Sequence, residues 1–248
     1  MSWLDLIQSR PEIERFNAWN RTQKVGMPPI PHYLQKHYWW AYVRPWAVRF
    51  WDSTWLVNLI LYGNYSRLRD ATLAAVGDLA GRILQVACCY GDLTPRLAAR
   101  AARAGGSLEV IDVLPIQLEA LREKLSEKTP VTLRPMDASV LTFPSQEYDL
   151  VLIFFLFHEQ PQAYREKTLR EALRVLKPGG RIIITDFAVP RPWHPIRLWL
   201  PFLGKLEPFA VALWNNELLK LLPEMAGLQW ERRTFFGNLF QVLIGRYG

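Results

Sequence analysis

The chain has only two cysteines, and they stand next to each other as Cys88 and Cys89. Neighbouring residues in a turn rarely form an unstrained disulfide, and the cysteine spacing typical of zinc sites is absent. We therefore expect two free thiols that serve as small, soft side chains. A reactive thiol is the alternative.

Long apolar runs are missing as well. No stretch of 18 or more uncharged apolar residues occurs, because Arg197, Lys205 and Glu207 interrupt the best candidate. A transmembrane helix is therefore not expected. The first 14 residues carry three acidic side chains, which fit neither a secretory signal nor an Arg-rich transit sequence. These absences predict a cytoplasmic protein.

Tryptophan is absent from the middle of the chain. Seven of the eleven tryptophans lie in the first 55 residues, and the other four lie from Trp193 onward. Tryptophan concentrates at the headgroup level of membranes, and Arg44, Arg49, Arg197 and Lys205 stand among these aromatic residues. The alternative is that the N-terminal aromatics simply pack on the core.

A net charge of +7 suits an anionic partner, either nucleic acid or a membrane surface. The basic residues are scattered and do not form a run with interleaved aromatics, so nucleic acid is not expected. We predict peripheral contact with the inner face of the cytoplasmic membrane. The sequence leaves the oligomeric state open.

No Gly/Ser-rich or Pro-rich linker divides the 248 residues. We predict an N-terminal helical extension over 1–78 that faces the substrate or membrane, and an α/β domain over 79–248. From residue 82 onward, short apolar runs alternate with helical patterns, which is typical of a parallel sheet. The expected strands are 82–87, 108–112, 131–135, 149–154, 181–186, 229–236 and 239–247.

Helices are expected between these strands, over 93–104, 115–126, 162–176 and 215–225. Pro115 suits the first turn of its helix, and Lys177-Pro178-Gly179-Gly180 is expected to end the helix before it and turn the chain into a strand. After Asp186 the frequent prolines cannot continue a regular element. We predict that residues 187–214 form a Pro/Trp-rich lid over the ligand cleft.

The most informative segment is Ile83-Leu84-Gln85-Val86-Ala87-Cys88-Cys89-Tyr90-Gly91-Asp92-Leu93. A strand that turns tightly into a helix presents backbone N–H groups to a ligand, and glycines normally line such a turn. Only Gly91 remains here. The Cβ atoms of Ala87 and Cys89 crowd the loop, so a cofactor is expected to sit displaced from the usual pose.

Two aspartates follow the next strands. Asp112 ends the second strand, where a carboxylate can accept both ribose hydroxyls of a bound nucleoside; an exposed strand-end residue is the alternative. Asp137 and Ala138 follow the third strand and can read an adenine edge, unless Asp137 only caps a turn.

The fourth strand leads to His158 and Glu159. Ligands bind outside the carboxyl ends of the strands in open α/β sheets, and histidine suits proton transfer near neutral pH. A His/carboxylate pair can also hold a divalent metal, although a single histidine after a strand is often structural.

This series, with Leu173-Arg174-Val175-Leu176-Lys177-Pro178-Gly179-Gly180, resembles the class I S-adenosylmethionine (SAM)-dependent methyltransferases over roughly 80–248. The nearest type is the ubiquinone and menaquinone methyltransferases. The resemblance implies a Rossmann-like fold, with a seven-stranded mostly parallel sheet and helices on both faces. The turn departs from that family, which usually carries an acid at Gln85 and glycines at Ala87 and Cys89.

The departing residues resemble the rhodoquinone biosynthesis (RquA) family over nearly the whole chain. The matching segments are the altered turn, Phe155-Leu156-Phe157-His158-Glu159-Gln160-Pro161, Tyr38-Trp39-Trp40-Ala41-Tyr42 and Asn58-Leu59-Ile60-Leu61-Tyr62-Gly63-Asn64. The resemblance implies a Mn²⁺-dependent transferase that converts ubiquinone, a lipid-soluble quinone, to rhodoquinone. SAM would donate an amine that replaces a ring methoxy group.

The expected roles fall into three sets. We assign catalysis to His158, Glu159 and Tyr90, and a metal to Asp92, His158 and Glu159; helix capping is the alternative for Asp92. Cofactor binding is assigned to Gln85, Ala87, Cys88, Tyr90, Gly91, Asp92, Asp112, Val113, Asp137, Ala138 and Phe154.

The neutral side chain of Gln85 fits amine transfer. A carboxylate there would favour the protonated amine of SAM, whereas amine transfer needs the nitrogen lone pair. Two alternatives remain, namely a conventional SAM-dependent quinone methyltransferase with an altered turn, and a catalytically inactive scaffold protein with a SAM-type fold.

Overall fold

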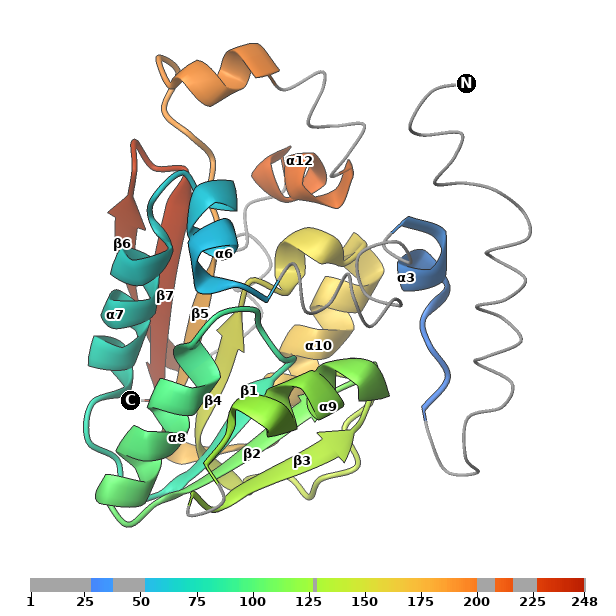
Figure 1. Cartoon of the computed structure of the whole chain (residues 1–248), viewed down its shortest axis with the longest axis vertical. Helices are drawn as coiled ribbons and strands as arrows, with labels where there is room; N and C mark the ends of the chain where they lie inside the picture. The colour runs from blue at the N-terminus through green and yellow to red at the C-terminus, as the bar shows by residue number, and fades with distance from the viewer. Residues whose placement is uncertain (1–27, 38–51, 127–128, 200–207, 216–226, 248) are drawn as a thin grey trace.

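The computed structural model describes residues 28–37, 52–126, 129–199, 208–215 and 227–247, and Figure 1 shows the arrangement of their helices and strands. They form a seven-stranded sheet in the order β3-β2-β1-β4-β5-β7-β6. Strands β1 to β5 run parallel, and β7 runs antiparallel to both β5 and β6. The predicted α/β fold with a mostly parallel sheet is confirmed. The strands are β1 (Arg82–Val86), β2 (Ser107–Asp112), β3 (Val131–Pro135), β4 (Tyr148–Phe154), β5 (Leu176–Phe187), β6 (Leu228–Phe235) and β7 (Phe240–Tyr247).

The strands alternate their side chains between two apolar layers, as the period of two in a strand requires. Ile83, Leu150 and Leu152 belong to a core cluster that also contains residues of α7 and α8. Their neighbours Leu84 and Val151 belong to a second cluster with residues of α10. The sheet is therefore covered on both faces, which suits a parallel sheet. The helices are α3 (His32–His37), α6 (Thr54–Ile60), α7 (Tyr65–Val76), α8 (Leu93–Arg103), α9 (Pro115–Lys124), α10 (Gln162–Arg174) and α12 (Pro208–Asn215), with the short 3₁₀ helices η1 (Phe157–Glu159) and η2 (Pro195–Trp199).

The Pro-Gly-Gly segment lies inside β5 and not before it, which corrects the predicted boundary. Helix α10 ends at Arg174, and β5 already pairs with β4 at Leu176. The register then shifts, so that Leu150 pairs with Arg181. Gly179 has φ +76°, a conformation that suits glycine. The segment therefore forms an irregularity within a strand that begins earlier than predicted.

The region predicted as an irregular lid contains two helices, η2 and α12. The prediction that its prolines prevent regular structure was wrong at these two places. Pro195 and Pro208 are the first residues of their helices, where the missing N–H of proline costs no hydrogen bond. A lid function for residues 187–214 stays a prediction.

Several sequence predictions concern residues outside the described ranges. These include most of the Trp-rich N-terminal segment, Tyr38 to Tyr42, Arg44, Arg49, Lys205 and residues 216–225 of the helix expected over 215–225. The part of the N-terminal segment that the structure describes contains α3, α6 and α7. Among the helices that the structure describes, none is long and apolar enough to cross a membrane.

The start of α8 depends on a tyrosine from α7. The Tyr65 hydroxyl accepts hydrogen bonds from the backbone N–H groups of Asp92 (2.7 Å) and Leu93 (3.0 Å). Gly91 has φ +87°, and a Cβ atom there would lie 2.3 Å from the Tyr65 oxygen. Gly91 is therefore required both by its backbone conformation and by the close approach of Tyr65.

Tyr65→Phe should lower the free energy of unfolding by about 1–3 kcal/mol, because two N–H groups at the buried start of α8 lose their acceptor. Denaturant unfolding measures this change. Tyr62→Phe is the control. Tyr62 is 46% exposed, so the loss of its hydroxyl should change the free energy of unfolding by less than about 0.5 kcal/mol. Equal stability of the Tyr65 variant and the wild type would contradict this role.

Candidate functional site

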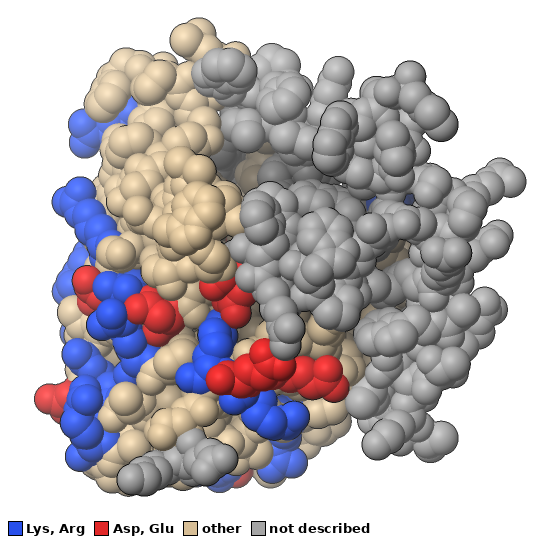
Figure 2. All heavy atoms as spheres, viewed as in Figure 1, with Lys and Arg blue, Asp and Glu red and all other residues tan. Residues whose placement is uncertain are grey.

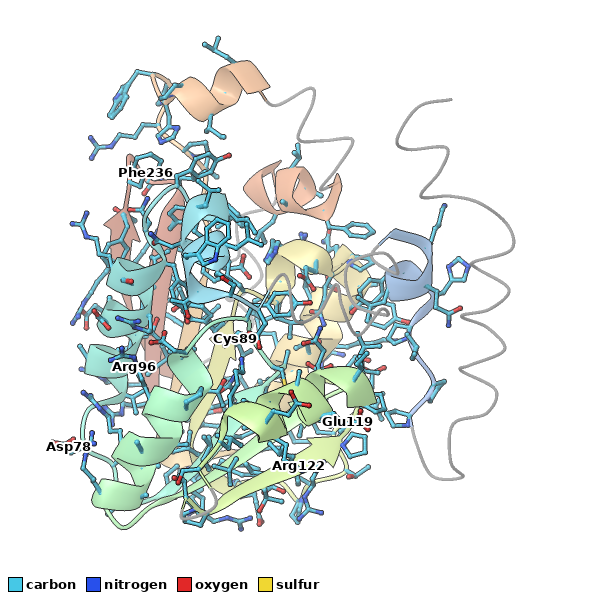
Figure 3. All side chains as sticks on the ribbon, viewed as in Figure 1. Asp78, Cys89, Arg96, Glu119, Arg122 and Phe236 are labelled. Atoms are coloured by element: carbon cyan, nitrogen blue, oxygen red, sulfur yellow. The ribbon has the colours of Figure 1, made fainter. Side chains whose placement is uncertain are left out.

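A cavity of about 460 Å³ lies at the carboxyl ends of β1, β2, β3 and β4. Ligands bind at this edge in open α/β sheets, and the volume is in the range of small-molecule sites. Residues of the loops after these strands form one wall, and residues of α3, α6 and α12 face them. Figure 3 shows Cys89 on the loop after β1, at this edge of the sheet.

The loop after β1 forms the tight turn that the sequence predicts, but with alanine in place of glycine. Ala87 has φ +71°, a region that alanine rarely adopts. Cys88 and Cys89 are free and half-buried against the core. Desolvation by burial raises the pKa of both thiols, which disfavours the reactive thiolate. The expectation of two free cysteines is confirmed.

Side chains accept hydrogen bonds from most backbone N–H groups of this loop. Asp112 accepts from Cys88 (2.8 Å), and Asp52 accepts from Gly91 (2.9 Å). The Tyr65 hydroxyl accepts from Asp92 and Leu93. In a Gly-rich turn such groups face a ligand. In this loop they donate instead to side chains of the protein itself.

Gln85 lies beneath the turn and does not line the cavity. Its side chain is fully buried, and its Nε2 donates to the Ala87 carbonyl (3.1 Å) and to Thr94 Oγ1 (2.9 Å). A carboxylate could not donate to the Ala87 carbonyl. The amide therefore supports the unusual conformation of Ala87.

Asp112 lies where the sequence predicts it, at the end of β2 and on the cavity wall. Its two oxygens accept backbone hydrogen bonds from Leu114 and Cys88, both at 2.8 Å. Burial raises the pKa of the Asp112 carboxyl to about 6, although these backbone donors limit the rise. Asp112 is therefore a buried acceptor and not an exposed strand end.

Four other predicted cofactor residues also line the cavity, namely Val113, Asp137, Ala138 and Phe154. Asp137 Oδ1 accepts from the N–H and the hydroxyl of Ser139, both at 2.8 Å. Asp137 thus caps its own turn and also lies beside the cavity, and its contact with an adenine edge stays a prediction.

Tyr90 lines the cavity as well, and its hydroxyl accepts a hydrogen bond from Gln117 Nε2 at 3.0 Å. Burial raises the pKa of this phenol above its ordinary value. Tyr90 is therefore a neutral hydroxyl at neutral pH. Sequence reasoning missed Gln117 and also Tyr33, which reaches the cavity from α3.

Asp92 does not line the cavity. Its carboxylate accepts from Arg69 (2.8 and 2.9 Å) and from Arg96 (2.6 Å). Partial burial raises its pKa, but the hydrogen bonds from the two guanidinium groups outweigh that effect and lower the pKa overall. Its side chain makes no capping hydrogen bond to α8. The Tyr65 hydroxyl accepts from the N–H groups at the start of this helix instead.

The predicted metal set of Asp92, His158 and Glu159 is not assembled. Two arginines neutralise Asp92, and no group of three His, Cys, Asp or Glu side chains in the described ranges is arranged to hold a metal ion. These residues therefore do not fit Mn²⁺, and we assign no step to a metal.

His158 and Glu159 lie on η1 and line the cavity. His158 Nδ1 is 3.2 Å from Asp186 Oδ1, and Nε2 is 3.7 Å from Glu159 Oε1. Asp186 is fully buried at the end of β5, and its Oδ2 accepts from the N–H of Phe157 at 2.8 Å. The position of Asp186, at the end of the strand beside β4, is the signal that could have revealed this partner.

The sequence of this chain is similar to those of known methyltransferases. A methyltransferase domain family matches residues 83–180. A demethylmenaquinone methyltransferase from Clavibacter sepedonicus is 37% identical over 193 residues, covering 73% of this chain and 76% of that protein. A ubiquinone/menaquinone biosynthesis C-methyltransferase, UbiE, from Azotobacter vinelandii is 32% identical over 201 residues, covering 73% and 78%.

Two other UbiE proteins match over shorter regions. The chain spans 62% of the length of the Pseudomonas paraeruginosa protein and 64% of that from Ectopseudomonas mendocina, at 33% and 34% identity over 61% and 65% of this chain. The alignments therefore cover less than two thirds of each of these two UbiE proteins.

Solved structures agree on the fold. A SAM-dependent methyltransferase from Aquifex aeolicus superposes with a TM-score of 0.56 at 21% identity, covering 83% of this chain and 99% of that one. The [4+2]-cyclase SpnF superposes with a TM-score of 0.55 at 21% identity, covering 73% and 80%. The chain thus belongs to the class I SAM-dependent methyltransferase family, in the branch related to the ubiquinone and menaquinone C-methyltransferases.

Proposed function

We propose that this protein is a SAM-dependent transferase that modifies the ring of a lipid-soluble quinone at the inner face of the cytoplasmic membrane. The observation that carries the proposal is the two-ended cavity at the carboxyl edge of the sheet. The carboxylates of Asp112 and Asp137 line it after β2 and β3, and the rings of Phe155 and Phe187 line it at β4 and β5, which lie on the other side of β1 in the sheet. A charged nucleoside cofactor and an apolar ring system suit these two ends.

The polar end fits the nucleoside part of SAM. Asp112 in its ionised form can accept hydrogen bonds from both ribose hydroxyls, and Asp137 with Ala138 lies beside it on the cavity wall to contact the adenine. SAM supplies the group that is transferred. The chain's residues bind and orient it.

The apolar end fits the quinone. Its wall includes Val57, Leu61, Phe155, Phe187 and Val211, which exclude water and contact an aromatic ring and the first units of a tail. His158 lies on the same wall, with Asp186 beside its Nδ1. This carboxylate orients the imidazole for a proton transfer during the reaction.

Two reactions are candidates. Quinone methylation is what the names of the related enzymes state, and these relatives favour it for this chain. The second candidate is the amine transfer that converts ubiquinone to rhodoquinone. The loop after β1 favours it, because Ala87 and neutral Gln85 replace the usual glycine and acid. The fold alone does not decide between them, since one structural neighbour is named a cyclase.

Two parallel incubations with SAM that carries ¹⁵N in its amine and ¹³C in its methyl group separate the two reactions. One contains a short-tail ubiquinone, and the other contains its reduced analogue without the ring methyl group. Mass spectrometry of the quinone should show one label in the product. Carbon-13 establishes methylation, and nitrogen-15 in place of methoxy establishes amine transfer. Neither label in either quinone, with SAM bound, would contradict both candidates and support the scaffold alternative.

SAM affinity should fall as the pH falls through about 6, because burial raises the pKa of Asp112 to about 6. The ionised form accepts the ribose hydroxyls, so protonation below this pH weakens binding by up to about tenfold per pH unit. Titration calorimetry measures the dissociation constant of SAM at pH values from about 5 to about 8, which lie on both sides of that pKa.

Asp112→Asn is the control for this pH dependence. The variant should bind SAM at least about tenfold more weakly at high pH, since a hydrogen bond to a charged group contributes about 1.5–3 kcal/mol, and it should lose the change near pH 6. An unchanged wild-type affinity across this range would contradict the role of Asp112.

If the transferred group is the amine, Gln85→Glu should reduce rhodoquinone formation at neutral pH. A buried carboxylate favours the protonated amine and cannot donate to the Ala87 carbonyl. Thr94→Val is the matched control, because it removes a partner of Gln85 (2.9 Å) without adding charge. Undiminished product from Gln85→Glu, or an equal loss in both variants, would refute the charge effect.

A further inference from the structure

Seven large apolar side chains are exposed at one end of the molecule. They come from α6 and the residue pair after it, from the segment around η2, and from the turn between β6 and β7. The set consists of Trp55 (67% exposed), Leu59 (64%), Ile60 (47%), Tyr62 (46%), Trp193 (66%), Leu198 (84%) and Phe236 (40%). We call this set the apolar cap.

The apolar cap is continuous across the three segments. The rings of Tyr62 and Phe236 stack with centroids 6.0 Å apart, and Phe236 also contacts His194 at 5.0 Å. Figure 1 shows α6, the orange helix η2 and the β6–β7 turn at the same end of the molecule, and Figure 3 labels Phe236 there. The cap is therefore one surface and not a set of scattered residues.

The sequence of α6 explains the exposure. Trp55 and Leu59 are four residues apart, which places them on one side of the helix, and Tyr62 follows two residues after its end. Leu56 is buried at 7% exposure. An amphipathic surface helix normally turns its polar side to water, whereas here the side turned to solvent is apolar.

The charge around the cap has one sign. Segments 53–68, 188–198 and 234–240 contain no Asp or Glu, but they contain Arg67, Arg191 and Arg197. Arg67 lies over the Phe235 ring and Arg191 over the Trp193 ring, at 5.3 and 5.9 Å. Figure 2 shows an uncharged surface over the upper left of the molecule with Lys and Arg at its border and Asp and Glu only below it.

The cap also adjoins the cavity. Ile60 and Tyr62 are exposed and line the cavity at the same time, and Ile196 lines it two residues before Leu198. An apolar surface with cationic side chains at its border suits the boundary between headgroups and acyl chains of an anionic bilayer.

We propose that the apolar cap docks this protein on an anionic lipid bilayer and that the cavity opens toward the bilayer between α6 and η2. Aromatic and aliphatic side chains of the cap enter the interfacial region, and Arg67 and Arg191 lie at the level of the phosphates. The entry route rests on the proposed function, since a lipid-soluble quinone would reach the cavity without crossing water. The docking itself rests on the surface alone.

Co-sedimentation with vesicles of phosphatidylcholine, with and without phosphatidylglycerol, tests the docking. The wild type should bind the anionic vesicles more strongly, and added salt should reduce that preference. The double variant Leu59→Glu with Leu198→Glu should bind at least about tenfold more weakly, because each apolar side chain withdrawn from hydrocarbon costs on the order of tenfold in binding.

Val140→Glu is the matched control. Val140 is 64% exposed, as Leu59 is, but lies on the loop after β3, so this variant should bind vesicles like the wild type. Unchanged binding of the double variant would overturn the proposal. Elution of the wild type as a dimer that the double variant converts to a monomer, with no vesicle binding, would assign the cap to a second copy of the chain instead.

A turnover assay separates this proposal from the proposed function. The double variant should keep wild-type turnover of a short-tail quinone in solution and lose turnover of a long-tail quinone in vesicles, because neither Leu59 nor Leu198 lines the cavity. Equal turnover of the long-tail quinone in both proteins would overturn the entry route. A wild type that binds vesicles through the cap but modifies neither quinone would refute the function and leave the docking intact.

Discussion

Four backbone N–H groups of the loop after β1 donate to carboxylates and a hydroxyl of the protein itself, and the rest of the site depends on this arrangement. Asp112 joins this loop to the one after β2 by accepting from Cys88 and Leu114. Asp52 and Tyr65 hold Gly91, Asp92 and Leu93. Glycines leave such a loop open to a ligand, whereas here neighbouring side chains fix its shape.

Replacement of the glycines has a chemical consequence. The positive φ of Ala87 needs support from the Gln85 amide, which a carboxylate at the same place could not give. The loop therefore departs from its family at two coupled positions, one in conformation and one in charge. Because of this coupling, both methyl transfer and amine transfer stay candidate reactions for this conventional fold.

The cavity contains the histidine and adjoins the apolar cap. Asp112 and His158 line the cavity, Asp186 lies beside His158 Nδ1, and Ile60 and Tyr62 line the cavity and are exposed as well. A charged cofactor and an apolar substrate can thus approach the same point from opposite sides.

Sequence alone determined the strands, their order of appearance and the carboxylates after β2 and β3, because local periodicity and strand ends are properties of neighbouring residues. It also identified the altered loop and the approach of His158 to the cleft. Only the tertiary structure revealed that Arg69 and Arg96 take Asp92 out of the proposed metal set and that Asp186 lies beside His158. It also revealed that α6 and the β6–β7 turn share one apolar surface. Apart from the contact of Arg96 with Asp92, which are four residues apart, these contacts join residues far apart in the chain, and no local pattern specifies them.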